Sequence, residues 1–200
     1  MAYGFMDIAS TPSVQAAQAS MGADHLWQDF KGHREFDRFT ENEAAFIAER
    51  DSFYLATVSE TGWPYVQHRG GPRGFIRALD DRTLGFVDFA GNRQYVSTGN
   101  LRDNARVCLF LIDYARRRRI KVWGTARTVP ATPELLAALA LPGYRARIEQ
   151  VVLVTVSAWD VNCPQHIPQK LDAAEVAGLV DGLRARIAEL EAELARTRAA

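Results

Sequence analysis

Short apolar segments follow one another closely between residues 53 and 159, and they constrain the fold more than any other feature. Runs of this kind, bounded by Gly-, Asp- and Pro-containing turns, are typical of β-strands. The connections between them are tight turns or short helical patterns, which do not suit repeated β-α-β units. The sequence therefore predicts a mainly β fold with peripheral helices, built as an antiparallel barrel or sandwich of six or seven strands.

The strand pattern is clearest in the sixth apolar segment. There Ile120 and Val122 alternate with Lys121 and Trp123, which predicts one buried face and one outward face. A Gly-rich connection at residues 70–74 lacks the strand and long helix of a dinucleotide-binding motif. The expected strands are residues 53–58, 63–69, 75–79, 83–89, 106–113, 119–129 and 151–159.

Helices are expected at both ends of the chain and between some strands. Residues 12–21 and 133–140 each begin with a proline suited to a first helical turn. Thr40 and Glu43 form a capping-box pattern that predicts a helix start. We expect an N-terminal helical extension at residues 1–39, a split-barrel domain at 40–168 and a C-terminal helix at 169–200.

The C-terminal helix carries an apolar stripe with heptad spacing. Its residues recur at alternating intervals of four and three, which is nearly three heptads of a coiled-coil seam. An amphipathic helix lying on the barrel and a two-stranded coil both satisfy this pattern. The stripe consists of Val176, Val180, Leu183, Ile187, Leu190 and Leu194.

Composition excludes several classes of function. The 200 residues carry 24 basic and 24 acidic side chains, so no overall field attracts nucleic acid or a membrane surface. No segment is long and apolar enough to span a bilayer, and no signal-peptide pattern is present. Two cysteines fit a reducing cytoplasm, where we expect the protein to act. Cys108 lies in an apolar run and is expected to be an inert core residue.

The segment 83–95 is the best candidate for a ligand site. An apolar strand ends at Gly91, and Asn92, Arg93 and Gln94 follow as a polar turn that opens a short helix expected to end near residues 99–100. A helix N-terminus offers free N–H groups and a positive dipole, which suits an anion such as phosphate. An ordinary strand-to-helix turn with a solvated arginine is the alternative.

Other polar clusters have two readings each. Residues 116–119 form an arginine cluster that is either a solvated hairpin tip or an anion or cofactor contact. Residues 162–167 are either a structural loop or a lid over a ligand. The four histidines are too scattered to predict a metal site, and no nucleophile–base arrangement indicates catalytic residues.

Taken together, three stretches resemble the pyridoxamine 5'-phosphate oxidase-like FMN-binding proteins, which have the split β-barrel fold. The stretches are residues 53–65, Gly91-Asn92-Arg93-Gln94 and residues 118–124. The chain is most similar to the branch described as predicted flavin-nucleotide-binding proteins, in which the Gly-Asn-Arg-Gln turn and an Asn-Cys-Pro-Gln-His segment, here 162–166, are typical.

The resemblance implies a homodimer that binds two FMN molecules at the subunit interface. It places one set of residues along the FMN phosphate and ribityl chain and a second set beside the isoalloxazine ring, where Arg119 comes from the second subunit. The first set is Gln67, His68, Arg69, Asn92, Arg93 and Gln94. The second set is Val87, Asp88, Arg119 and Lys121.

The resemblance implies FMN binding without implying vitamin B6 as the substrate. Gln94 stands where the true pyridoxamine phosphate oxidases carry a lysine, and their C-terminal Arg and Trp substrate pattern is not found in this sequence. We therefore expect an FMN-dependent oxidoreductase acting on a small molecule. The alternatives are a non-enzymatic protein that binds or stores flavin or senses redox state, and a related protein that binds haem or a deazaflavin.

Overall fold

The computed structural model describes residues 4–26, 37–161, 164–171 and 173–199. The chain divides into two compact units. The first, Met1–Ile112 with Arg119–Cys163, contains the sheet. The second, Asp113–Arg118 with Pro164–Ala200, contains a hairpin tip and the C-terminal helix. Within the second unit, Gln169 Nε2 donates to Ala115 O at 3.0 Å. The predicted three-part division of the chain stays a prediction.

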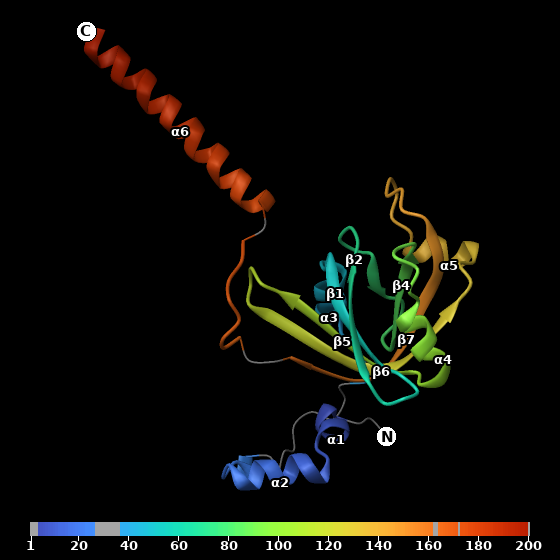
Figure 1. The fold of residues 1–200 in the computed structure, drawn as a ribbon. Helices are drawn as coiled ribbons and strands as arrows, with labels where there is room; N and C mark the ends of the chain where they lie inside the picture. Colours follow the sequence, from blue (N-terminus) through green and yellow to red (C-terminus); the bar gives the residue numbers. More distant parts are fainter. Residues whose placement is uncertain (1–3, 27–36, 162–163, 172, 200) are drawn as a thin grey trace. The chain divides into compact units, whose positions relative to one another are not determined.

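A single seven-stranded sheet forms the first unit, in the order β2-β1-β5-β6-β7-β4-β3. The strand pairs whose register is described are antiparallel. Figure 1 shows how strongly this sheet curves into a split barrel, so the predicted fold class is confirmed. The strands are β1 (Ser52–Val58), β2 (Pro64–Gly70), β3 (Ile76–Ala78), β4 (Thr83–Phe89), β5 (Arg106–Asp113), β6 (Arg118–Val129) and β7 (Ile148–Val161).

Aromatic contacts in the core show how the sheet closes. Phe53 on β1 packs edge-on against Phe86 on β4, with 5.1 Å between ring centroids. It also stacks on Phe75, just before β3, at 5.6 Å. All three rings are at most 1% exposed. Strands from the two halves of the sheet order therefore share one interior, and burying such large rings is a major source of stability.

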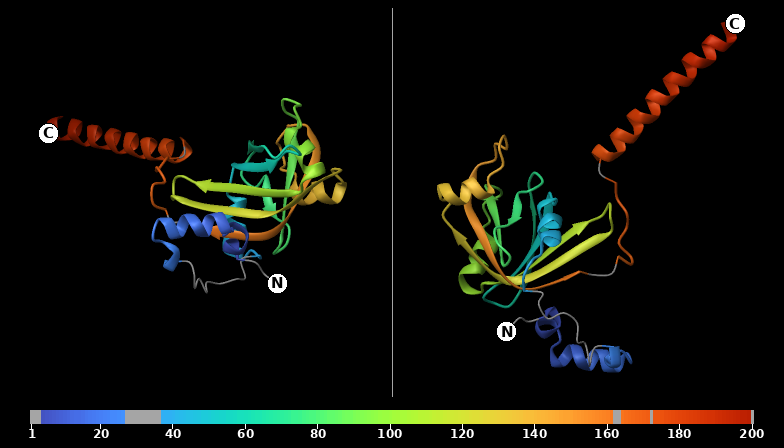
Figure 2. Two further views of the ribbon diagram at one scale, coloured as in Figure 1. Left: turned by 60° about the horizontal axis from the view of Figure 1, so that its bottom comes forward. Right: turned by 180° about the vertical axis from the view of Figure 1, so that it is seen from behind.

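The described part of the chain contains six α-helices and one 3₁₀ turn besides the strands. Figures 1 and 2 draw the helices as coiled ribbons. Thr40 and Glu43 form the predicted capping box at the start of α3, which buries Phe46 and Ile47 in the core. Helix α5 buries Leu139 against Val87 in a second apolar cluster. The helical elements are α1 (Phe5–Ala9), α2 (Pro12–Ser20), η1 (Asp24–Leu26), α3 (Glu41–Ala48), α4 (Val96–Asp103), α5 (Pro133–Leu139) and α6 (Ala173–Ala199).

Two features differ from the sequence prediction. Helix α4 begins at Val96 and runs to Asp103, so residues 99–100 lie inside it and do not end it. Cys108 is half-buried on the outward face of β5 and is not a core residue, because alternation along β5 buries its neighbours Val107 and Leu109 instead. Burial nevertheless raises the pKa of the Cys108 thiol above its ordinary value, which keeps it unreactive near neutral pH.

Candidate functional site

A polar pocket of about 190 Å³ opens where the edge strand β2, strand β4 and the start of α4 come together. It is lined by both charged and hydrogen-bonding side chains. Five of the residues predicted from the sequence line it: Gln67, Arg69, Asp88, Asn92 and Arg93. Arg69 on β2 and Asn92 after β4 are 23 positions apart in the sequence, so the chain folds back on itself to bring them together.

Strand pairing explains why Gln67 and Arg69 face this pocket. They lie opposite Leu55 and Phe53 of β1, and both of those side chains point into the barrel. Residues directly opposite in an antiparallel pair share a face, so Gln67 and Arg69 point inward as well. His68, between them, points outward and meets the ring of Tyr54 edge-on at 5.7 Å.

Arg69 and Asp88 form a buried ion pair at the floor of the pocket. Their side chains are only 16% and 7% exposed. Asp88 Oδ2 also accepts a hydrogen bond from Gln150 Nε2 at 2.9 Å. The Arg69 Nε atom is buried and has no hydrogen-bond partner among the described residues. An orphaned charged donor is costly inside a protein, so this atom is an attractive point for an anionic ligand.

The turn between β4 and α4 is held in an unusual backbone conformation. Asn92 Oδ1 accepts from the Gln94 N–H at 3.1 Å, which closes an Asx turn. Arg93 and Tyr95 both have left-handed φ values, 60° and 52°. Non-glycine residues adopt this region at a cost of about 1–2 kcal/mol each. The turn stores strain that supports a functional role.

Helix α4 is fastened to three strands by side-chain hydrogen bonds. Ser97 Oγ donates to Gln67 Oε1 on β2 at 2.8 Å, and Asn100 Nδ2 donates to Thr57 Oγ1 on β1 at 2.9 Å. Thr98 Oγ1 accepts from Gln150 Nε2 on β7 at 3.1 Å. These bonds hold the first turn of α4 against the pocket, so its free backbone N–H groups are rigidly positioned.

Two carboxylates share the pocket with two arginines, but each carboxylate is already engaged. Asp88 pairs with Arg69, and Glu149 accepts from Arg147 at 2.7 Å and from Tyr95 Oη at 3.1 Å. Arg93 has no ion-pair or hydrogen-bond partner among the described residues. The charge left uncompensated at the pocket is therefore the Arg93 guanidinium, which favours an anion with several acceptor oxygens.

Two other predicted residues, His68 and Arg119, lie on the outward face of the sheet. His68 and Tyr54 are opposite each other on β2 and β1, and Tyr54 is opposite Phe110 on β5. The Arg119 guanidinium on β6 lies 6.0 Å from the centroid of the Phe110 ring. These four side chains form a row across four strands, which we call the outer row. The Arg119 Nε atom is the other buried donor without a partner in the described part of the chain.

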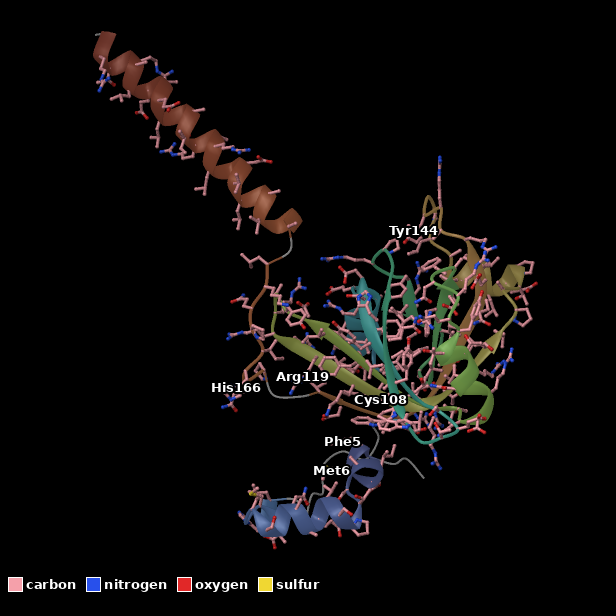
Figure 3. The ribbon with its side chains drawn as sticks, in the orientation of Figure 1. Phe5, Met6, Cys108, Arg119, Tyr144 and His166 are labelled. Carbon is pink, nitrogen blue, oxygen red and sulfur yellow. The ribbon has the colours of Figure 1, made fainter. Side chains whose placement is uncertain are left out.

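The remaining predicted residues do not line the pocket. Val87 is buried between Leu139 and Val151, and Gln94 accepts from Asn92 Nδ2 at 3.2 Å. Lys121 lies on the outward face, where Nζ pairs with Asp160 Oδ2 at 3.4 Å. Figure 3 shows Arg119 and Cys108 on the β5–β6 part of the sheet, with Tyr144 at the other end of the first unit.

Sequence reasoning missed several pocket residues, and nothing in their local pattern would have revealed them. Tyr95 and Thr98 belong to the first turns around α4, while Glu149 comes from β7. Glu149 has no partner on β4, because the β4–β7 register shifts between Asp88, opposite Gln150, and Phe89, opposite Ile148. Such an irregularity redirects a side chain from the regular alternation. Tyr54 and Phe110 of the outer row are visible in the sequence only as alternating strand residues.

Other sequence candidates have these placements. Arg116, Arg117 and Arg118 are exposed at the β5–β6 hairpin tip, where Arg116 pairs with Asp113 at 3.1 Å. The segment 162–167 lies partly outside the described residues, since 162 and 163 are not among them. In the described part of the chain, no cluster of three His, Cys, Asp or Glu side chains could hold a metal ion. None of the described helices combines the length and apolar character needed to cross a membrane.

Comparison with known proteins gives one family match and a set of similar structures. The family model described as pyridoxamine 5'-phosphate oxidase matches residues 39–176. HupZ from Group A Streptococcus is 19% identical with a TM-score of 0.50, over 66% of this chain and 99% of that chain. A putative pyridoxamine 5'-phosphate oxidase from Lactobacillus delbrueckii is 21% identical with a TM-score of 0.47, over 62% and 94% of the two chains.

A third solved structure, an FMN-binding protein from Syntrophomonas wolfei, is 12% identical with a TM-score of 0.47, over 76% of this chain and 95% of that chain. No curated protein sequence matches the chain. At 19% identity, the likeness to HupZ supports the fold alone.

Proposed function

The chain belongs to the pyridoxamine 5'-phosphate oxidase family, and on that premise we propose that it is an FMN-binding flavoprotein that acts as a homodimer. The observation that carries the proposal is the pocket between β2, β4 and α4. Its uncompensated Arg93 and the orphaned Nε of Arg69 are the donors that a phosphate monoester requires. These residues fit the phosphate end of FMN.

In this proposal Arg69, Asn92 and Arg93 hold the phosphate. The Asx turn at Asn92 sets the Arg93 backbone, and the hydrogen bonds of Ser97 and Thr98 keep the start of α4 beside it. A phosphate near pH 7 carries between one and two negative charges, so two guanidinium groups and helix N–H groups match it. Gln67 keeps its amide NH₂ as a donor for the ribityl hydroxyls.

The dimer is supported by the positions of the predicted residues, because some of them lie on the inward face of the sheet and others on the outward face. Arg119 and His68 cannot reach the pocket of their own protomer because they point outward, whereas the pocket lies on the inward face. A second protomer docked on the outer row would bring Arg119 to the flavin of its partner. Tyr54 is 41% exposed there, which is a high value for an aromatic ring on a sheet face.

FMN, when bound, would supply hydride or electron transfer, and the protein would bind and orient it. We propose an oxidoreductase that acts on a small molecule in the cytoplasm. One observation favours a second function, flavin storage or redox sensing. The pocket lining contains no histidine or cysteine, Asp88 and Glu149 are already paired, and the Tyr95 hydroxyl donates to Glu149, so the titratable lining residues other than Arg93 are engaged with one another or with Arg147.

The absorption spectrum of the purified protein is the first test, followed by titration of stripped protein with FMN while flavin fluorescence is recorded. We expect a flavin spectrum and quenching on binding. A colourless protein that leaves FMN fluorescence unchanged would overturn the proposal. A Soret band would identify haem, and a blue-shifted flavin-like band would identify a deazaflavin. Rapid turnover of the bound flavin by one defined donor and acceptor would separate an oxidoreductase from a storage protein.

A further inference from the structure

Helix α6 presents an apolar stripe that its own unit does not cover. The helix is the longest of those described, and it extends far past residue 176, where the family match ends. The stripe residues are between 37% and 65% exposed, and from Val176 to Leu194 they span about 27 Å of helix. A stripe of this length on an isolated helix needs a partner.

The four central residues of the stripe have the pattern of a two-stranded parallel coil, whereas Val176 falls at d and Leu194 at a. When the stripe is placed at heptad positions a and d, β-branched Val180 and Ile187 occupy a. Leu183 and Leu190 occupy d. β-branched residues at a with leucine at d favour parallel dimers over trimers and tetramers. Gly178 and Gly182 fall at the outward positions f and c, where an added Cβ would meet no neighbouring atom.

The flanking charges match a second copy of the same helix. In a parallel, in-register pair, each g residue faces the e residue five positions later on the other helix. Arg186 would face Glu191 of the second copy, and Glu193 would face Arg198. By symmetry each contact occurs twice, so the coil gains four attractive pairs. Within one helix, Arg186 bonds to Glu189 at the outward position c, so pairing with Glu191 of the second copy would require Arg186 to change this partner.

An antiparallel pair of fully overlapping helices is disfavoured by the same charges. In that arrangement g residues face g residues and e residues face e residues. Arg186 would then lie opposite Arg186 of the second copy, and Arg184 opposite Arg184. Like charges placed directly opposite each other are destabilising. An antiparallel pair shifted by one heptad avoids this repulsion. The double charge exchange described below distinguishes that arrangement from the parallel coil.

We propose that α6 pairs with α6 of a second copy of this chain as a parallel, in-register, two-stranded coiled coil. The coil is a dimerisation element separate from the outer row and from the flavin pocket. It raises the effective concentration of one protomer for the other, so that a moderate barrel interface suffices to keep both flavin sites assembled. The proposal does not depend on FMN binding.

Disulfide trapping in the full-length chain tests the pairing directly. Thr197 occupies a d position, so a parallel coil brings the two copies of residue 197 face to face. In a Cys108→Ser, Cys163→Ser background, Thr197→Cys should cross-link in a glutathione buffer about tenfold faster than Arg196→Cys, which points outward at position c. In either antiparallel register the two copies of residue 197 are roughly 25 Å or more apart. Equal rates for the two variants would overturn the proposal.

Charge exchange tests the orientation. Adding Arg186→Glu or Glu191→Arg to the Thr197→Cys protein should slow trapping severalfold, because each places like charges across the interface. The double exchange should restore the original rate in a parallel coil. In the shifted antiparallel register it would not, because the new acidic side chain at position 186 would face Glu193 and the new basic side chain at position 191 would face Arg184. Cross-linking at residue 197 should also occur in FMN-free protein, so failure of flavin binding and failure of the coil are distinguished.

Discussion

Arg69 on β2 forms an ion pair with Asp88 on β4, and this contact joins an edge strand to the other half of the sheet across the opening of the barrel. Asp88 is also bonded to Gln150, so the pair is anchored on β7. The same arginine leaves its Nε without a described partner beside the pocket. Arg69 thus helps to close the barrel and, in our proposal, also binds phosphate.

Removing Arg69 should therefore damage both stability and affinity, and a second substitution separates the two effects. Arg69→Met leaves the buried Asp88 carboxylate unpaired and should cost about 3–5 kcal/mol of unfolding free energy. Adding Asp88→Leu should recover most of that loss, because two apolar side chains then face each other. FMN affinity should stay low in both variants. Urea denaturation and FMN titration are the measurements, and recovery of affinity in the double variant would contradict the assigned role.

Arg93→Gly should weaken FMN binding without weakening the fold. The substitution removes a charged donor, worth about 1.5–3 kcal/mol of binding free energy. It also relieves a left-handed residue, which should raise the unfolding free energy by up to about 1 kcal/mol. Arg93→Lys is the matched control that keeps the charge and loses the bidentate geometry, and its affinity should be intermediate. Unchanged FMN affinity in Arg93→Gly would mean that the turn has only a structural role.

Tyr54→Glu should turn the proposed dimer into a monomer, because it places a charge in the centre of the outer row. The control is Tyr144→Glu, since Tyr144 is 45% exposed, close to the 41% of Tyr54, and lies at the other end of the unit (Figure 3). Sedimentation velocity should be run on chains truncated after residue 171, so that α6 does not hold protomers together. Identical sedimentation of the two variants would argue against the outer row as an interface.

Gly124→Ala should destabilise the fold, whereas Gly99→Ala should stabilise it. At Gly124 the strand register shifts against β7, and an added Cβ would lie 2.2 Å from Thr155 O. Relieving that clash requires backbone movement, which should cost about 1–3 kcal/mol. At Gly99, inside α4, an added Cβ meets nothing within 4 Å. Alanine there should add about 0.5–1 kcal/mol. Both stability changes are measured from the urea concentration at the midpoint of unfolding, provided that the slope of unfolding free energy against urea stays the same.

Alkylation of Cys108 should be slow near neutral pH. Its rate should keep rising with pH after the rate for a small free thiol has reached its plateau. Burial raises the pKa of its thiol, so the nucleophilic thiolate is a smaller fraction at each pH. Nearby Lys121 acts in the opposite direction and is the weaker cause. Peptide mapping after iodoacetamide treatment gives the rate at this residue. A rate at neutral pH equal to that of N-acetylcysteine would contradict the assigned burial.

The family resemblance and most strand positions could be predicted because they rest on local patterns. Strands β4 and β5 have the predicted bounds, and the Thr40–Glu43 capping box forms as expected. The end of α4 was predicted near residues 99–100 but lies at Asp103, and the Asx turn at Asn92 and the left-handed Tyr95 precede its first residue, Val96. Those two features are decided by how the turn meets β7 and the pocket, where Tyr95 bonds to Glu149.

The sequence by itself determined the period of each strand, the helix start at Thr40, the heptad stripe of α6 and the Gly-Asn-Arg-Gln turn, because each depends on residues close together in the chain. Only the tertiary structure decided which candidates meet. The curvature of the sheet brought Arg69 to Asp88, and the β4–β7 pairing brought Glu149 to the pocket and Gln150 to Asp88. Alternation sent His68 and Arg119 to the opposite face. Contacts between distant segments depend on sheet order and register, and local spacing carries neither.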